Sequence, residues 1–365
     1  MFFLLLLVFS TGFSQKQIAL TFDDLPMASP RISLQHTIDI NQKLLSTLKE
    51  QHVPAIGFVN ESMLEVDNKT AERVNILRLW VNQGYDLGNH TYSHVDYNFI
   101  PYSAFLQEFK KGEIYTKKVL QEKNKKIKFF RPAFLSTGST LKKKLRLEKL
   151  LQDNGYTMAL STIESSDFTF NLIYLQAKFQ QDSAGMRKVV KDYLDFTEKK
   201  LVYFESVTDK VVGTSIPQIL LVHANDINAD NLELLLQLLR EHHYEFTSLE
   251  KALQNPVYSQ KYAYVDKRGI SWLHRWNTQN RQALMRQEPR IPENIKTQNE
   301  VAKRYQFFFL LKSRVMGYNY TAFHIGLFLI TAVLFVAFIY LVLVRRKRKI
   351  YYTNKTLDLK LQKKH

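Results

Sequence analysis

The sequence predicts an α/β domain in which parallel strands are covered by helices, either barrel-like or doubly wound. Strand-like and helix-like segments alternate about seven times between Gln17 and Gln254, and this alternation is typical of parallel sheets. The segment Ile219–Val222 is continuously apolar, as expected of a strand that is buried on both faces. Polar side chains follow several of the expected strands, where parallel α/β folds collect their functional residues.

The expected elements follow one another along the chain. Apolar residues at helical spacing mark the helices, and Gly84 and Gly155 follow two of them as C-terminal caps. Short apolar runs mark the strands, and Pro132 ends one of them. The expected strands are Gln17–Phe22, Pro54–Val59, Tyr85–Asn89, Ile127–Arg131, Thr157–Ile163, Ile219–His223 and Tyr244–Phe246. The expected helices are Ser33–Gln51, Ala71–Gln83, Tyr102–Glu122, Leu141–Asn154, Ala184–Lys200, Asp230–His242 and Leu249–Leu253.

Both ends of the chain carry apolar segments that predict secretion and membrane attachment. Residues 1–15 resemble a secretory signal peptide with a short apolar run at Phe2–Phe9. Ile325–Val344 is uncharged and long enough to span a bilayer, and Arg345–Lys349 directly after it is basic. The positive-inside rule places this basic end in the cytoplasm. We therefore expect a single-pass membrane protein whose α/β domain is extracytoplasmic, that is, periplasmic or extracellular.

The predicted organisation has five parts. They are a signal peptide at 1–15, the α/β domain at 16–254, a juxtamembrane spacer at 255–322, a transmembrane helix at 323–344 and a basic cytoplasmic tail at 345–365. Within the spacer, Trp272 and Trp276 are expected to pack on the domain, or else to hold a ligand.

Composition excludes several classes of function. The net charge is +17, but the excess lies in lysine-rich stretches and the basic tail, and no nucleic-acid-binding motif is present. We therefore expect no nucleic-acid partner, and the sequence indicates no protein partner. The chain has no cysteine, which excludes disulfides and thiolate ligands, so any zinc ion must be held by histidine and carboxylate.

Three groups of polar residues carry the candidate chemistry. Asp23-Asp24 follows the first expected strand, His90 and His94 follow the third, and His223 ends a later one. If the chain turns helically after Asn89, the spacing of the two histidines brings both imidazoles to one face, where they can share a metal ion. Neighbouring strand residues point to opposite faces, so both aspartates can serve one site only if they lie past the strand, in the turn at Leu25-Pro26.

These motifs resemble those of the polysaccharide deacetylases (the NodB-homology domain, carbohydrate esterase family four). The resemblance covers about Gln17–Leu253 and rests on four motifs in order: Thr21–Asp24, His90–His94, Phe130–Pro132 and Leu220–His223. It implies a distorted (β/α) barrel of about seven parallel strands that acts on N-acetylated sugars. It also implies a divalent metal, usually zinc, held by Asp24, His90 and His94.

The resemblance assigns roles to the neighbouring residues too. Asp23 is the implied general base, Arg131 its partner and His223 the general acid. Asp167 loosely matches a further family motif, which the family counts as its fourth, and would orient His223. By the same analogy, Leu221 would line a pocket for the acetyl methyl group, and the backbone N–H of Phe134 would donate to the oxyanion.

The expected function is metal-dependent hydrolysis of acetyl groups from N-acetylglucosamine-type envelope polysaccharide. A metal lowers the pKa of bound water and polarises the acetyl carbonyl, while a protonated histidine assists departure of the amine. Two alternatives remain. One is a membrane-anchored glycan-binding protein with a decayed deacetylase fold, favoured by Leu25-Pro26 and Ala133-Phe134, where the family usually has Gly-Pro and a second proline with an aromatic residue. The other is an O-acetyl esterase that uses the same site.

Overall fold

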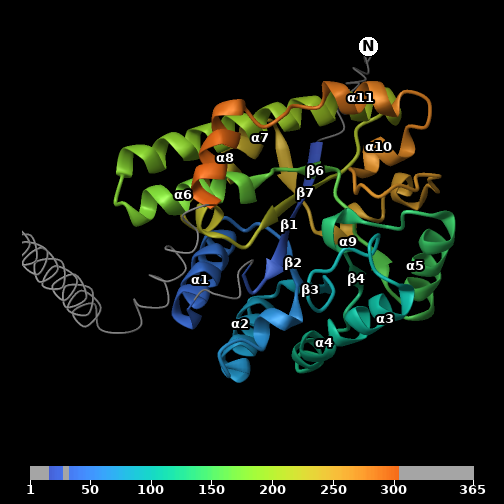
Figure 1. Cartoon of the computed structure of the whole chain (residues 1–365), viewed down its shortest axis with the longest axis horizontal. Coiled ribbons are helices and arrows are strands. Elements are labelled where there is room, and N and C mark those ends of the chain that lie inside the picture. The colour runs from blue at the N-terminus through green and yellow to red at the C-terminus, as the bar shows by residue number, and fades with distance from the viewer. Residues whose placement is uncertain (1–15, 28–32, 304–365) are drawn as a thin grey trace, which may run out of the picture. The chain divides into compact units, whose positions relative to one another are not determined.

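The structure is a computed structural model that describes residues 16–27 and 33–303. Its strands form one eight-stranded sheet in which every pairing is parallel. This confirms the prediction of a parallel α/β domain, and Figure 1 shows the strands inside a surrounding set of helices. The strands are β1 (Lys16–Leu25), β2 (Ala55–Val59), β3 (Asp86–Asn89), β4 (Phe129–Phe130), β5 (Thr157–Met158), β6 (Ile163–Glu164), β7 (Gln218–His223) and β8 (Tyr244–Phe246).

The order of the strands gives the sheet a curled, barrel-like topology with one open seam. Neighbours run β5-β4-β3-β2-β1-β7-β6, and β8 pairs with the start of β1. Following the sheet from β1 through β5 and then from β6 through β7 returns to β1, so the strands keep their chain order around the sheet. In the described part of the chain, β5 and β6 form the two edges and do not pair with each other.

Helices cover the outside of this sheet and bury their apolar stripes against it. In the first helix, for example, Ile40, Leu44, Leu45 and Leu48 are all buried, and each such side chain contributes about 1.5–3 kcal/mol to folding. The helices are α1 (Leu34–Glu50), α2 (Thr70–Asn82), α3 (Tyr102–Lys111), α4 (Ile114–Gln121), α5 (Leu141–Asp153), α6 (Asp167–Phe179), α7 (Ser183–Val211), α8 (Asp226–Glu241), α9 (Leu249–Ala252), α10 (Trp272–Trp276) and α11 (Arg281–Gln287).

Two predicted elements are wrong because each is interrupted. The single helix expected at Tyr102–Glu122 is divided at Gly112 into α3 and α4. A Cβ at Gly112 would lie 2.6 Å from the carbonyl carbon of Thr91, so this glycine permits a close approach of two backbone segments. The single strand expected at Thr157–Ile163 is two short strands, β5 and β6, on opposite sides of the open seam.

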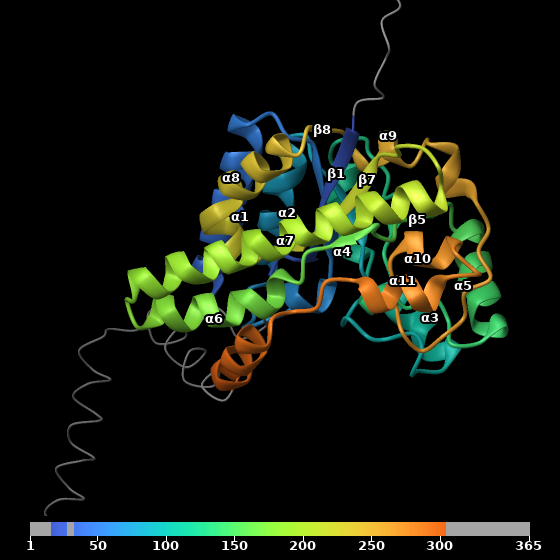
Figure 2. The same cartoon turned by 90° about the horizontal axis from the view of Figure 1, so that it is seen from above.

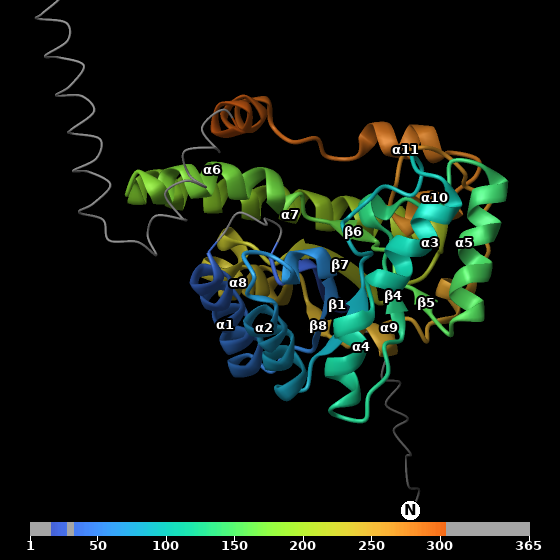
Figure 3. The same ribbon diagram turned by 60° about the horizontal axis from the view of Figure 1, so that its bottom comes forward.

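The helix α6 was not predicted, and α7 extends to Val211, well beyond the expected end at Lys200. Figures 2 and 3 show α6 and α7 side by side along one flank of the molecule. The unpredicted helix matters for the site, because it begins at Asp167.

The part of the predicted spacer that the structure describes is packed onto the α/β domain. Trp272 and Leu273 in α10 are buried, and so is Ile295 in the helical stretch 293–303. The side-chain amide of Asn299 donates to the carbonyl oxygen of Thr169 in α6 at 2.6 Å. In the structure, the compact domain therefore continues past the expected boundary at residue 254.

Among the helices that the structure describes, none combines the length and the apolar composition needed to cross a bilayer. The predicted signal peptide (1–15), transmembrane helix (323–344) and basic tail (345–365) lie outside the described residues.

Candidate active site

The three predicted metal ligands, Asp24, His90 and His94, converge at the carboxyl ends of β1 and β3. The Oδ1 atom of Asp24 lies 3.6 Å from Nε2 of His90 and 3.4 Å from Nε2 of His94. Two ligand atoms of a tetrahedral zinc site, each bonded at about 2.0–2.1 Å, lie roughly 3.4 Å apart. The Oδ1 atom of Asp24 is buried and has no hydrogen-bond partner among the described residues. A buried carboxylate oxygen without a donor is costly, and a divalent cation between these three atoms would satisfy it.

The two histidines meet through a loop, so the prediction of a helical turn after Asn89 is wrong. Thr91 and His94 have left-handed backbones, with φ of 71° and 56°. The side chain of Asn89 fixes this loop, because its Oδ1 accepts from the N–H of Thr91 at 2.7 Å and its Nδ2 donates to Phe109 at 3.0 Å. The side-chain amide of Asn60 also donates to the carbonyl of His90 at 2.6 Å.

Asp23 and Asp24 both face the site because the strand is irregular there. Both lie within β1, not past its end as predicted. The register against β2 shifts between Phe22 and Leu25, and Asp24 has a left-handed φ of 63°. Such an irregularity lets neighbouring residues escape the usual alternation of a strand.

Asp23 is paired with Arg131, as the resemblance implies. The Nη1 atom of Arg131 donates to Oδ1 of Asp23 at 2.6 Å and to the hydroxyl of Thr21 at 2.8 Å, and its Nε donates to the carbonyl of Ala159 at 2.6 Å. Both ionised side chains are almost fully buried. The other oxygen of Asp23 lies 3.6 Å from Nε2 of His90, beside the candidate metal position.

The backbone carbonyl of Arg131 also orients the ring of His90. The ring's Nδ1 donates to the carbonyl oxygen of Arg131 at 2.7 Å, in the tautomer that leaves Nε2 free to bind a metal. Burial lowers the pKa of His90, although the neighbouring Asp23 opposes this. A neutral imidazole is the form that a metal ion requires.

On the opposite side, His223 is held by Asp167. The Nδ1 atom of His223 donates to Asp167 at 2.7 Å, and Nε2 lies 4.0 Å from Oδ2 of Asp24. Burial alone would lower the pKa of His223, but the charge and hydrogen bond of Asp167 raise it to about 10. The imidazole is therefore protonated at neutral pH and can serve as a proton donor.

Asp167 itself is fixed by amide donors that the sequence did not point to. It accepts from the backbone N–H of His223 at 2.7 Å, from Asn225 at 3.0 Å and from Asn228. Asn225 is the N-cap residue of α8, and Asn228 is the third residue of that helix.

Two exposed aromatic rings flank the site. Phe134 is 57% exposed, and its ring centroid lies 4.6 Å from that of His94. Phe168, not predicted, is 52% exposed and lies 5.8 Å from the ring of His223. Leu221 is buried in β7, two residues before His223 and therefore on the same face of the strand.

Several side chains lie away from the site or have partners that the sequence did not suggest. Trp272 is buried and stacks on Trp276 at 6.1 Å, so this pair packs in the domain as expected. His36 contacts Asp226 at 3.1 Å, and His274 contacts the hydroxyl of Tyr203 at 2.8 Å.

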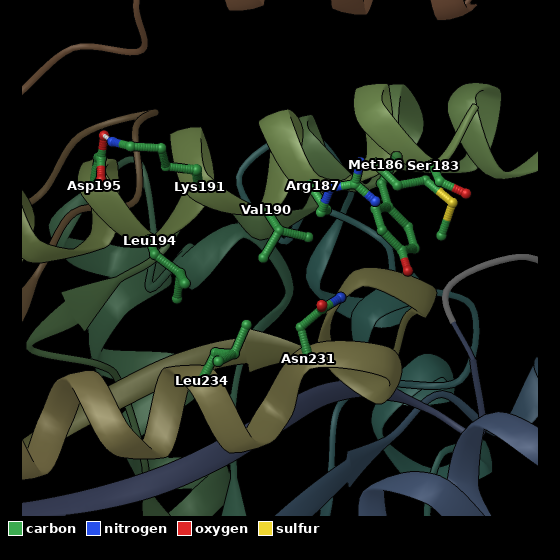
Figure 4. Close-up of a pocket in the computed structure, with 10 residues that line it drawn as sticks. Ser183, Met186, Arg187, Val190, Lys191, Leu194, Asp195, Asn231 and Leu234 are labelled. Atoms are coloured by element: carbon green, nitrogen blue, oxygen red, sulfur yellow. Dashed lines mark hydrogen bonds and ion pairs between the residues drawn. The ribbon is translucent and has the colours of Figure 1, made fainter.

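A separate groove of about 440 Å³ lies between α7 and α8 (Figure 4). Val190 and Leu194 of α7 and Asn231 and Leu234 of α8 contribute to its walls. The groove is lined by none of the predicted site residues, so it is separate from the candidate active site.

Comparison with known proteins supports the resemblance. Residues 11–159 match the polysaccharide deacetylase family. A peptidoglycan-N-acetylglucosamine deacetylase of Bacillus cereus is 33% identical over 87 residues, which cover 24% of this chain and 26% of that protein. The match thus spans about a quarter of the relative's length.

Solved structures with lower identity also align. A Bacillus cereus polysaccharide deacetylase is 19% identical with a TM-score of 0.45, covering 64% of this chain and 92% of its own. A chitin deacetylase of Colletotrichum lindemuthianum is 18% identical with a TM-score of 0.45, covering 66% and 88%. A Bacillus anthracis pseudoenzyme of carbohydrate esterase family four is 15% identical with a TM-score of 0.44, covering 66% of each chain.

The family match covers the motifs that hold Asp23, Asp24, His90, His94 and Arg131. The resemblance predicted from the motifs is therefore confirmed over residues 11–159, the part of the chain that matches the polysaccharide deacetylase family.

Proposed function

We propose that this protein is a metal-dependent deacetylase of N-acetylglucosamine-type envelope polysaccharide. One observation carries the proposal. The candidate metal ligands Asp24, His90 and His94 lie between a buried carboxylate, Asp23, and the imidazole of His223. An amide hydrolase needs these groups together: a place for a metal, a base for the attacking water and an acid for the leaving amine.

The residues divide the reaction between them. Asp23 lies beside the metal position and takes a proton from the attacking water, while the bond from Arg131 fixes the direction of its carboxylate. The Nε2–H of His223 donates a proton to the leaving amine, and Asp167 holds that ring in position. The backbone N–H of Phe134 is the proposed second donor to the developing oxyanion.

Zinc is the proposed cofactor, because two imidazoles and one carboxylate form a typical catalytic zinc site with an open position for water. When bound, a zinc ion lowers the pKa of that water and polarises the acetyl carbonyl.

A sugar substrate is supported by the surroundings of the site. The exposed rings of Phe134 and Phe168 flank it, and aromatic side chains commonly line sites for small ligands. The Bacillus cereus relative is named for its action on peptidoglycan N-acetylglucosamine, which motivates an envelope polysaccharide as the substrate here.

Acetate release from N-acetylated chito-oligosaccharides tests this function. The metal-loaded protein should release acetate, and Asp23→Asn should reduce the rate by about 100-fold or more, within the range of general base catalysis. Asp153→Asn, in an exposed ion pair with Lys149, is the matched control and should behave as the wild type. Release from O-acetyl esters alone would indicate an esterase instead, and no release from either substrate would refute the proposal.

We further propose that the enzyme is anchored in a membrane with this domain outside the cytoplasm. The apolar residues 1–15, the apolar run Ile325–Val344 and the basic tail after it support this topology. Reporter fusions after residue 303 and after residue 365 test it: an enzyme that is active only outside the cytoplasm should work at the first position and not at the second. The opposite pattern, or recovery of the full chain in the soluble fraction, would refute it.

A further inference from the structure

The loop that carries Phe134 is held by an arginine from a distant part of the chain. Arg275 in α10 is fully buried. Its Nη2 donates to the carbonyl oxygen of Leu135 at 2.6 Å and its Nη1 to the hydroxyl of Thr137 at 2.6 Å, while Nε donates to Ile270 at 2.9 Å. All three nitrogens of this guanidinium are thus occupied by backbone or hydroxyl acceptors. Two of these acceptors belong to residues 133–137, which we call the rim loop.

Gly269 supports the rim loop by direct contact. A Cβ at this position would lie 1.8 Å from the carbonyl oxygen of Phe134 and 2.9 Å from the carbonyl carbon of Leu135. Both are backbone atoms, so no side-chain rotation could relieve the overlap. Only glycine therefore fits between the rim loop and its support.

The rim loop needs such support because its backbone is in an unfavourable conformation. Phe134 and Leu135 both have left-handed backbones, with φ of 56° and 53°. Residues with a Cβ rarely adopt this conformation, and it persists where the surroundings determine it. The result is a Phe134 ring that projects from the loop toward His94.

The part of the chain that contains Gly269 and Arg275 also contacts the loop after the metal ligands and the open seam of the barrel. The side-chain amide of Asn98, four residues after His94, donates to the carbonyl of Lys267 at 2.9 Å. At the seam, the N–H of Trp272 donates to Ser161 at 3.0 Å and the hydroxyl of Ser271 donates to Thr162 at 2.6 Å. Residues 262–276, which we call the supporting segment, therefore contact the rim loop, the loop after the metal ligands and the open seam of the sheet.

We propose that the supporting segment is part of the active site and that Arg275 is a positioning residue, which holds the rim loop so that Phe134 faces the substrate. This role rests on the proposed deacetylase function. It assigns a specific task to residues that lie beyond both the matched family segment and the strand–helix repeat. The substrate class it serves is the N-acetylated sugar chain, which would be bordered by the Phe134 ring.

Arg275→Lys tests the role, with Arg281→Lys as the matched control. Arg281 packs on the ring of Tyr264, as Arg275 does, but its hydrogen bonds go to the carbonyls of His274 and Arg275 within or beside α10. We expect kcat/KM on chito-oligosaccharides to fall by about 10- to 100-fold in Arg275→Lys, because small misplacements at a site cost this much. Arg281→Lys should stay within about threefold of the wild type. Affinity for Zn²⁺ should be unchanged in both variants.

A double-mutant cycle separates positioning from general destabilisation. If Arg275 acts through Phe134, adding Arg275→Lys to Phe134→Ala should cost no more than about twofold beyond Phe134→Ala alone. Effects that multiply fully would overturn the positioning role. If Arg275→Lys folds poorly, Thr137→Val is the alternative test. It removes one acceptor of Arg275 with little change in size, and it should also lower kcat/KM.

Hydrogen exchange provides a readout that is independent of activity. The N–H groups of Leu135 and Ser136 are bonded to Pro132 and Ala133. Their exchange should become at least about tenfold faster in Arg275→Lys and remain unchanged in Arg281→Lys. Unchanged exchange in Arg275→Lys would overturn this inference. A wild-type protein that releases no acetate would instead overturn the proposed function, whatever the exchange shows.

Discussion

The buried ion pair between Arg131 and Asp23 makes a quantitative prediction about stability. The side chain of Arg131 is 0% exposed and that of Asp23 is 4% exposed, with 2.6 Å between Nη1 and Oδ1. Arg131→Met would leave the carboxylate buried without its counter-ion. Removing one partner of a buried pair typically costs about 3–5 kcal/mol. Total stabilities are only about 5–15 kcal/mol, so this one change should remove a large part of the free energy of unfolding.

Denaturant unfolding of four metal-free proteins measures the effect: wild type, Arg131→Met, Asp23→Asn and the double variant. The double variant should be more stable than the sum of the single losses implies, by at least about 1.5 kcal/mol, because neither charge is then left alone. Lys149→Met breaks an exposed pair with Asp153 and should change stability by about 0.5 kcal/mol or less. A loss below about 1 kcal/mol for Arg131→Met, or strictly additive losses, would show that the pair is not buried as described.

Three further predictions concern the metal loop, the acid and pH. Asp167→Asn removes the charge that raises the pKa of His223 to about 10, so the alkaline limb of the kcat/KM profile should move to lower pH; an unmoved limb would contradict this. Gly112→Ala should weaken Zn²⁺ binding by about tenfold or more, because its Cβ would lie 2.6 Å from the backbone of Thr91. Gly155 has open space around it, so Gly155→Ala should leave Zn²⁺ affinity unchanged. Competition with a chelator measures both affinities. Burial lowers the pKa of His274 from 6.5 to about 4, so below pH 6.5 the unfolded state binds a proton that the folded state does not. The free energy of unfolding should therefore fall by up to about 3 kcal/mol between pH 6.5 and pH 4; His274→Gln should flatten this dependence in urea unfolding, and the exposed His243→Asn should not.

The sequence predicted the positions of most strands, because strands that are buried on both faces have continuous apolar runs. It also predicted the positions of Asp24, His90 and Arg131 at strand ends, since parallel topology gathers these ends at one edge. The means by which His90 and His94 meet was wrong. A spacing of four suggests a helical turn, but left-handed residues at Thr91 and His94 bring the rings together within a loop. Such conformations are rare for residues other than glycine, so the pattern alone favours the helix.

Contacts between distant segments account for the other differences. Gly112 interrupts a good helical pattern because another backbone passes close to it, and no local signal encodes that neighbour. The helix that begins at Asp167 follows two serines, which favour turns. The segment after residue 254 is polar and contains prolines, so it reads as a spacer; its buried members, such as Arg275, bond to residues more than a hundred positions away.

The open seam between β5 and β6 has a consequence for how this protein can change. A fully paired barrel fixes its circumference through strand number and register. Here, side-chain and backbone hydrogen bonds from Ser271 and Trp272 bridge that one interval. Insertions or deletions near these two residues would change the bridge between β5 and β6 without breaking any strand pairing.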